Sequence, residues 1–246
     1  MIELERVAST QDELRALAAD GAPAFTVVRA DLQTAGRGRR GRSWETRPGA
    51  ALLASVLLRP SRPTSELASL AIVGGLAAAR VARGLGVDAR VRWPNDVVVD
   101  GRKLAGVLAE LLDGPAVLLG VGLNAGADHA DLPATDGLPA TSLRLEGARE
   151  ASPTELATLL VAELGPLCAR FDAGGFEAVQ SDVSAIDALD GSELELLLAD
   201  GTTASGVARG VGPDGSLVLE TAEGRREHRS GLVARVHGGA LRESAP

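Results

Sequence analysis

Glycine and arginine alternate in one short segment, which holds the densest group of side chains in the chain that could bind an anion. Residues 36–41 read GRGRRG, and Arg42 follows directly. Glycines let a backbone wrap closely around an anion, and guanidinium groups supply charge and forked hydrogen-bond donors to phosphate or carboxylate. The segment therefore favours an anion-binding loop. A solvated basic loop is the alternative, although four arginines in six residues are unusual in an acidic protein.

The same six residues also match the glycine fingerprint of dinucleotide-binding folds. That fingerprint needs its last glycine to open a helix, whose N-terminus receives the pyrophosphate. Here Pro48-Gly49 follows seven residues later, and a strand is expected next. The context therefore disfavours a Rossmann fold.

A second group of candidate residues surrounds Lys103, the single lysine beside 24 arginines. Residues 92–96 read RWPND and combine an aromatic ring, a fixed proline φ and two short polar side chains, which suits a nucleotide or phosphate contact. Lys103 follows the Asp100-Gly101 turn, so its ammonium group has a defined place where a point charge can bridge a carboxylate and a phosphate. Gly106 leaves room for a ligand beside it. The alternatives are a buried tryptophan beside an Asx turn and a surface lysine.

A third segment, residues 120–124, reads GVGLN. Its glycines allow close approach to a strand, and Asn124 could bind a base edge or a ribose. A β-bulge followed by a polar turn is the alternative. Each of the three segments is a weak signal alone, but their presence together in this order is specific.

Apolar periodicity and turn residues predict the elements that must position these groups. Thr10 and Glu13 have the spacing of a capping box, which predicts a short helix ended by Gly21. Further helices are expected over 64–85 and 153–171, and strands near 25–28, 52–58, 97–99, 104–112 and 116–123, the last three forming an antiparallel meander. Short strands near 193–198, 203–210, 216–221, 225–229 and 232–237 indicate a small β-barrel. The fold class is therefore α+β: residues 1–187 form a domain with a mixed, mainly antiparallel sheet and helices, and residues 188–246 form a small β-barrel domain.

Composition restricts the class of partner. The chain of 246 residues has a net charge of −8, which argues against a general DNA or anionic-membrane surface. The apolar run 67–79 is shorter than the roughly 18 residues that a membrane span needs, and Glu3, Glu5 and Arg6 occupy the place of a signal-peptide core. We expect a cytoplasmic protein that binds neither DNA nor membrane.

Cysteine and histidine usage argues against a thiolate or histidine metal site. Cys168 is the only cysteine, and His129, His228 and His237 lack metal-ligand spacing. Cys168 is expected to be a small buried apolar side chain.

Taken together, the sequence closely resembles the biotin protein ligases, also called biotin-[acetyl-CoA-carboxylase] ligases. The matching segments are 9–13 (STQDE), 33–44 (QTAGRGRRGRSW), 92–96 (RWPND), 101–106 (GRKLAG) and 120–124 (GVGLN). The resemblance implies a biotin/lipoate-ligase-like catalytic domain followed by an SH3-like barrel. It also implies ATP-dependent biotinylation of a lysine on a biotin carboxyl carrier domain, through biotinoyl-5′-AMP and with release of pyrophosphate. ATP and Mg²⁺ would be required, with biotin as substrate.

The resemblance also implies roles for individual residues. Lys103 and Arg39 would be catalytic. Biotin would contact Ser9, Thr10, Gln33, Gly36, Arg37, Lys103, Gly106 and Gly122. ATP and the adenylate would contact Arg37, Gly38, Arg39, Arg40, Arg42, Trp44, Asn95, Lys103, Asn124 and Arg235. Asp96 is the one candidate magnesium ligand, chosen only because it is near in sequence.

Two departures and two alternatives accompany this interpretation. Many family members have lysine where Arg92 precedes the WPND segment. Here the STQDE segment begins at residue 9, so we expect the form without the DNA-binding domain of the repressor members. A lipoate- or octanoate-protein ligase is the alternative enzyme, and a non-catalytic biotin sensor is the alternative from another class. Both a monomer and a homodimer are compatible with the sequence.

Overall fold

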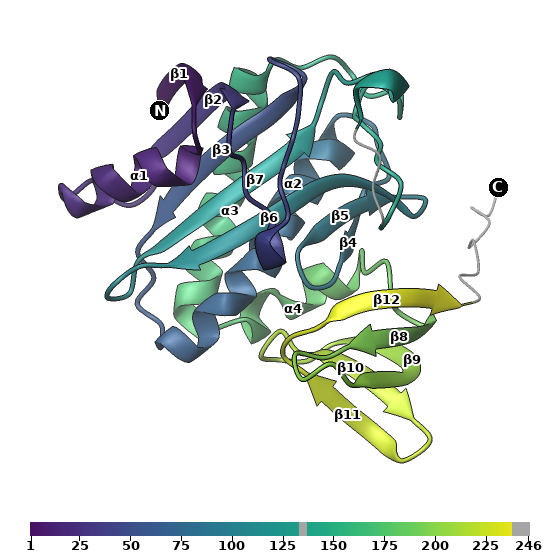
Figure 1. Ribbon diagram of the computed structural model, residues 1–246. Coiled ribbons are helices and arrows are strands. Elements are labelled where there is room, and N and C mark those ends of the chain that lie inside the picture. The colour runs from purple at the N-terminus through teal and green to yellow at the C-terminus, as the bar shows by residue number, and fades with distance from the viewer. Residues whose placement is uncertain (133–136, 238–246) are drawn as a thin grey trace.

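Two β-sheets organise the chain in the computed structural model, which describes residues 1–132 and 137–237 (Figure 1). The larger sheet has the strand order β1-β2-β3-β7-β6-β5-β4, and the smaller one has the order β11-β10-β9-β8-β12. The strands of the larger sheet are β1 (Ile2–Val7), β2 (Val27–Gln33), β3 (Ala51–Leu58), β4 (Arg90–Arg92), β5 (Asp96–Val99), β6 (Arg102–Leu111) and β7 (Val117–Asn124). The smaller sheet contains β8 (Glu193–Leu197), β9 (Thr203–Val211), β10 (Leu217–Thr221), β11 (Gly224–His228) and β12 (Leu232–His237).

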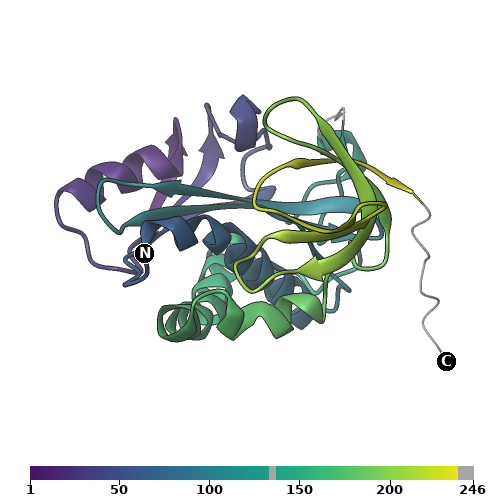
Figure 2. The same ribbon diagram turned by 90° about the horizontal axis from the view of Figure 1, so that it is seen from below.

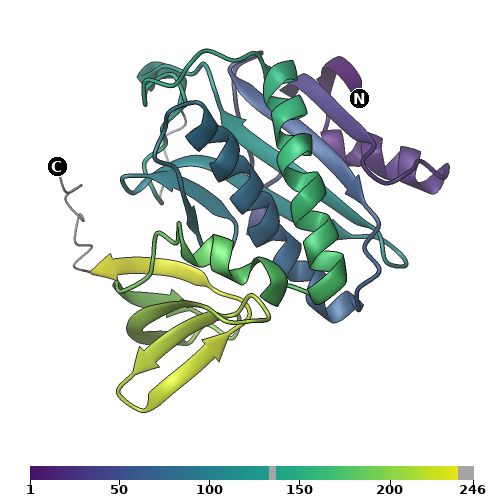
Figure 3. The same ribbon diagram turned by 180° about the vertical axis from the view of Figure 1, so that it is seen from behind.

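Helices cover both faces of the larger sheet. They are α1 (Thr10–Ala19), α2 (Leu70–Gly84), α3 (Pro153–Gly174) and α4 (Glu177–Ser184), with short 3₁₀ turns η1 (Arg39–Gly41), η2 (Thr64–Ser69) and η3 (His129–Asp131). Seen along the sheet, α1 lies on one side and α2 with α3 on the other (Figures 2 and 3). Strand alternation explains this, because Val27 packs in the core under α2 and α3 while the next residue, Val28, packs with Leu14 of α1.

The larger sheet is mixed and mainly antiparallel, as the sequence predicts. Only β1 and β2 pair in parallel among its strands; every other pair is antiparallel. The sequence analysis missed β1, an edge strand whose side chains are mostly exposed and therefore give a weak core pattern. The meander β5-β6-β7 is confirmed, and it brings the RWPND, GRKLAG and GVGLN segments onto adjacent strands.

The predicted capping box at Thr10 is wrong by one residue. Ser9 is the N-cap of α1, and its hydroxyl accepts a hydrogen bond from the backbone N–H of Gln11. Thr10 cannot cap the helix because its hydroxyl is bonded to Gln33 and Ser55 instead. The first turn of α1 is therefore tied to the polar cluster that adjoins the site described below.

The most apolar helix of the chain is a core helix. Thr64–Gly84 forms one helical run, longer than the run 67–79 noted in the sequence, and by length and composition alone it could cross a membrane. However, 72% of its most apolar 18-residue window is buried inside the protein. Packing against the sheet therefore accounts for its hydropathy.

The smaller sheet confirms the five predicted C-terminal strands, but not their closure into a barrel. In the described residues its strand order is open, with β11 and β12 at opposite edges. The β9–β10 turn contacts the larger unit, since Trp93 Nε1 donates a hydrogen bond to the carbonyl oxygen of Gly215 at 3.0 Å. Gly215 has φ +82° and lies against Ser69, Ile72 and Phe176, so this position favours glycine.

The segment that joins the two units pairs with β4. Val91 donates to the carbonyl of Ile186 and accepts from the backbone N–H of Ala188. Between these two residues lies Asp187, where burial raises the carboxyl pKa to about 6. The predicted domain boundary after residue 187 falls in this packed segment and stays a prediction.

Core packing at Gly74 of α2 leads to a stability prediction. A Cβ at this position would lie 2.9 Å from Val107 Cγ1 and 3.0 Å from Leu119 Cδ2. Overpacking should outweigh the gain in helix propensity, so we expect Gly74→Ala to lower the free energy of unfolding by about 1–2 kcal/mol in urea denaturation. Gly84→Ala in the same helix is the control, because nothing lies within 4 Å of its added Cβ. It should be neutral or stabilising, and equal stabilities of the two variants would contradict the packing described.

Candidate active site

Bare backbone at the centre of the larger sheet forms the floor of the candidate site. Gly106 of β6 and Gly122 of β7 are direct partners across the strand pair. The indole ring of Trp44 lies on both: a Cβ at Gly122 would be 2.4 Å from Trp44 Cε2, and one at Gly106 would be 3.0 Å from Cζ3. The room that the sequence analysis assigned to a ligand is thus filled by Trp44. Its indole N–H is buried and has no hydrogen-bond partner in the described residues.

Lys103 stands at the edge of this floor. Its Nζ lies 2.7 Å from Asp96 Oδ1 and 5.6 Å from the centroid of the Trp44 ring. The Asp96 contact is an ion pair without hydrogen-bond geometry, because Asp96 Oδ1 has no hydrogen-bond partner. A carboxylate or phosphate oxygen from a ligand could therefore compete for the ammonium group.

The glycine–arginine loop, residues 36–44, folds back on itself as a small hairpin. Trp44 N donates to the carbonyl of Gly36 at 2.9 Å, and Gly38 N donates to the carbonyl of Arg42 at 2.7 Å. Gly36 leaves room for the returning chain, since a Cβ there would be 2.4 Å from the Trp44 carbonyl oxygen. The loop thus delivers the Trp44 ring to the sheet and turns its arginines in different directions.

Four arginines line a small cavity that also includes Asp96, the ion-pair partner of Lys103. Its lining consists of Arg39, Arg40, Arg42, Arg92, Trp93, Pro94, Asn95, Asp96, Gly231, Leu232 and Val233. Arg39 Nη1 donates to Asn95 Oδ1 at 3.0 Å, and Asn95 Nδ2 donates to the carbonyl of Val107. Burial lowers the guanidinium pKa of Arg39 and of Arg92. Such partly desolvated cations suit a polyanion such as a phosphate chain.

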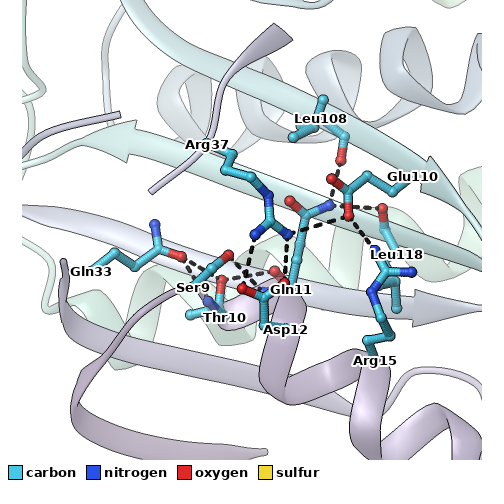
Figure 4. A network of polar contacts seen from close by, with 11 residues as sticks. Ser9, Thr10, Gln11, Asp12, Arg15, Gln33, Arg37, Leu108, Glu110 and Leu118 are labelled. Atoms are coloured by element: carbon cyan, nitrogen blue, oxygen red, sulfur yellow. Dashed lines mark hydrogen bonds and ion pairs between the residues drawn. The ribbon is translucent and has the colours of Figure 1, made fainter. Parts of the chain in front are cut away.

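A buried polar cluster adjoins the N-terminus of α1 (Figure 4). Gln33 Oε1 accepts from the backbone N–H of Thr10 at 2.7 Å and from the Thr10 hydroxyl at 3.0 Å. The Thr10 hydroxyl also lies 2.8 Å from Ser55 Oγ on β3. Three predicted residues, Ser9, Thr10 and Gln33, therefore do come together.

Sequence reasoning missed two members of this polar region. Ser55 is fully buried, and its signal was a lone hydroxyl inside the apolar run 51–58. Gln11 donates through Nε2 to the carbonyls of Leu108 and Leu118, which fixes α1 on strands β6 and β7. Gly120 makes room for the Gln11 amide, since a Cβ there would be 3.0 Å from Gln11 Cδ.

Three predicted residues lie outside the groups described so far. Arg37 is not in the cavity wall and pairs instead with Asp12 and Glu110 (Figure 4). Asn124 is buried and donates to the carbonyl of Thr141 at 2.9 Å. Arg235 of β12 is 71% exposed at its side chain, lies 3.9 Å from Glu195, and is not in the cavity wall.

No dedicated metal centre is present in residues 1–132 and 137–237. These residues hold no group of three or more histidine, cysteine, aspartate or glutamate side chains that could hold an ion. Asp96, the candidate magnesium ligand, is paired with Lys103.

Comparison with known proteins identifies the family of this chain. Residues 3–124 match the family model of the biotin/lipoate A/B protein ligases. A biotin--[acetyl-CoA-carboxylase] ligase from Paracoccus denitrificans is 34% identical over 232 residues, which cover 91% of this chain and 95% of that relative. The chain belongs to the biotin/lipoate A/B protein ligase family.

Two further comparisons show that this ligase is similar in sequence and structure to biotin protein ligases. The biotin--[acetyl-CoA-carboxylase] ligase of Mycobacterium tuberculosis is 35% identical over 218 residues, covering 86% of this chain and 80% of that protein. The structure of the biotin protein ligase from Aquifex aeolicus in complex with biotin and ATP superposes with a TM-score of 0.82 at 28% identity, covering 94% of this chain and 95% of that one. Every predicted site residue of this ligase except Arg235 lies inside the matched range 3–124.

The contact between Trp44 and the sheet generates a prediction. Gly122→Ala places a Cβ 2.4 Å from Trp44 Cε2, far closer than a van der Waals contact, so the Trp44 ring must leave the glycine floor. We expect a severalfold increase in acrylamide quenching of tryptophan fluorescence, because Trp93, the other tryptophan, stays buried. Gly126→Ala, with nothing within 4 Å of its Cβ, is the control. Unchanged quenching in Gly122→Ala would show that Trp44 does not rest on this floor in solution.

Proposed function

We propose that this ligase activates biotin with ATP and transfers it to a lysine of a biotin carboxyl carrier domain. The observation that carries the proposal is the position of Lys103, between a glycine floor and a cavity lined by four arginines. One side suits a small carboxylate ligand and the other a phosphate chain. The names of the relatives, and the biotin and ATP in the Aquifex aeolicus structure, support the choice of substrates.

In the proposed first step, a biotin carboxylate oxygen attacks the α-phosphorus of ATP. The new bond joins that oxygen to phosphorus, and the bond between the α-phosphorus and the bridging oxygen to the β-phosphate breaks, so biotinoyl-5′-AMP forms and pyrophosphate leaves. Carboxylate and triphosphate repel each other, and charge accumulates in the transition state. Lys103, after exchanging Asp96 for the ligand oxygens, would hold the two anions together, and Arg39 would stabilise the phosphate oxygens.

In the proposed second step, the amine of a carrier lysine attacks the acyl carbon of the mixed anhydride. An amide bond forms, the bond from the acyl carbon to the phosphate oxygen breaks, and AMP leaves while the amine loses its proton. Water would hydrolyse the same anhydride, so the site has to be covered between the two steps. The loop that contains Trp44 and the arginines is in position to cover it.

The remaining predicted contacts divide between the two ligands. Biotin would be surrounded by Ser9, Thr10, Gln33, Gly36, Gly106 and Gly122. The nucleotide would contact Gly38, Arg40, Arg42, Trp44, Asn95 and Asn124. The resemblance assigns Arg37 and Arg235 to these ligands as well, but in the structure both guanidinium groups pair with carboxylates, so neither side chain takes part in the two steps above. Trp44 would have to swing off the glycine floor before biotin enters.

Mg²⁺ would enter with the ATP phosphates, as it does in sites that supply few protein ligands. The described residues do not fit a dedicated magnesium centre, since Asp96 is the nearest carboxylate and already pairs with Lys103. Cytoplasmic location, the absence of DNA binding, and an SH3-like fold for the C-terminal sheet stay proposals, as does the domain boundary after residue 187.

Mass spectrometry of a carrier domain tests the proposed function. The purified carrier is incubated with the full chain, MgATP and either biotin or lipoate. We expect one biotin adduct on one lysine, no lipoate adduct, and no adduct without ATP. Modification by lipoate alone would move the enzyme to the lipoate branch of its family. No modification by either, with biotin still bound, would favour a sensor.

Substitution of Lys103 tests the catalytic assignment. Lys103→Arg keeps the charge but replaces a compact ammonium by a bulkier planar fork, so we expect biotin-dependent pyrophosphate release to fall by about 10²–10³-fold. Arg102→Lys is the control, because the neighbouring Arg102 pairs with Glu146 and is not in the cavity wall. It should retain activity within about twofold of wild type. Near-normal pyrophosphate release by Lys103→Arg would overturn the assignment.

A further inference from the structure

Arg37, at the beginning of the glycine–arginine loop, is held by a carboxylate on a different element. Its Nη1 and Nη2 atoms each donate to one oxygen of Asp12 on α1, both at 2.8 Å (Figure 4). This forked geometry satisfies both carboxylate oxygens at once and is the most specific form of ion pair. The hydrogen bond from Arg37 lowers the pKa of the Asp12 carboxyl, so the pair is ionised at neutral pH.

A second carboxylate extends the contact to the sheet. Glu110 of β6 lies 3.5 Å from Arg37 Nη2 and 2.6 Å from Arg15 Nη2, so the four side chains form one alternating chain of charges (Figure 4). Asp12 and Glu110 each stand on rigid elements, and α1 is fixed to β6 and β7 through Gln11. Networks of this kind contribute more than isolated surface pairs.

Opening of this loop is required if a ligand is to reach the glycine floor. Trp44 ends the loop hairpin and its ring occupies the space above Gly106 and Gly122. The loop is therefore attached at three points: by Trp44 on the floor, by Arg39 on Asn95 and by Arg37 on α1. The floor contact must break when a ligand enters, whereas the Arg37 contact lies outside the floor and can persist.

We propose that Asp12 is a positioning residue, which holds the glycine–arginine loop over the site by pairing with Arg37. Through this pair Asp12 sets how often the loop opens, and hence how long a reactive intermediate stays covered. Asp12 touches neither proposed substrate and acts through Arg37. The claim about loop opening stands on the ion-pair geometry alone; the claim about the intermediate rests on the proposed function.

Limited proteolysis tests loop opening without any substrate. Trypsin cleaves after arginine, and Arg39, Arg40 and Arg42 offer sites inside the loop. We expect Asp12→Asn to raise the cleavage rate at these sites by about two- to fivefold at low ionic strength, the range for a well-formed exposed pair. The difference should shrink at high salt because exposed charges are screened.

Glu13→Gln is the matched control for this experiment. It removes the same charge from the same helical turn, but Glu13 has no ion-pair partner in the described part of the chain. It should cleave like wild type, and Asp12→Glu should restore most of the protection. Equal melting temperatures of Asp12→Asn and Glu13→Gln would show that any difference in cleavage does not come from a change in global stability. If Asp12→Asn and Glu13→Gln cleave at the same rate, the proposal is wrong.

Retention of the intermediate tests the second claim. Biotinoyl-5′-AMP formed on the enzyme should be lost about two- to fivefold faster from Asp12→Asn than from Glu13→Gln, in step with the proteolysis rates. Equal loss rates would overturn the claim about the intermediate. A wild-type enzyme that forms no adenylate would instead refute the proposed function and leave the proteolysis result to decide the role of Asp12.

Discussion

Direct contact between an aromatic ring and bare backbone governs the arrangement of the site. Gly106 and Gly122 face each other on the two central strands β6 and β7, and the absence of side chains lets Trp44 lie against the sheet. The position of Trp44 fixes one end of the glycine–arginine loop, and the Lys103 ammonium lies beside the ring, 5.6 Å from its centroid. A larger residue at either position would clash with the ring and lift it from the sheet, so the placement of the loop depends on this one contact.

Local concentration of positive charge is the second requirement, in a chain whose net charge is −8. Folding gathers Arg39, Arg40, Arg42 and Arg92 around one cavity, although three come from the loop and one from the end of β4. Mutual repulsion makes such a cluster costly, and partial burial lowers the guanidinium pKa of Arg39 and Arg92. The cluster therefore favours the binding of anions, because a bound anion would reduce the repulsion between the guanidinium groups.

The C-terminal sheet takes part in the same arrangement. Residues 231–233 complete the wall of the arginine cavity, and Gly215 accepts a hydrogen bond from Trp93, the residue that begins the Trp-Pro-Asn-Asp segment. A single segment thus packs against the second unit with Trp93 and presents Asn95 and Asp96 to the site. Displacement of the C-terminal sheet would disturb both, since the Trp93 ring is fully buried at this junction.

Local pattern in the sequence determined the α+β class, the antiparallel meander, the five C-terminal strands and the chemistry of the loop. These depend on periodicity, turn residues and side-chain type over short spans, which a single sequence displays directly. The local sequence did not predict the edge strand β1, the helix cap at Ser9 or the burial of Ser55. Each of these depends on which other strand or helix packs against that residue in the fold. Likewise, Arg37 and Arg39 are two residues apart and look equivalent in the sequence. Only the tertiary structure separates them, since α1 and β6 bring carboxylates to Arg37 while the Trp-Pro-Asn-Asp segment brings Asn95 to Arg39.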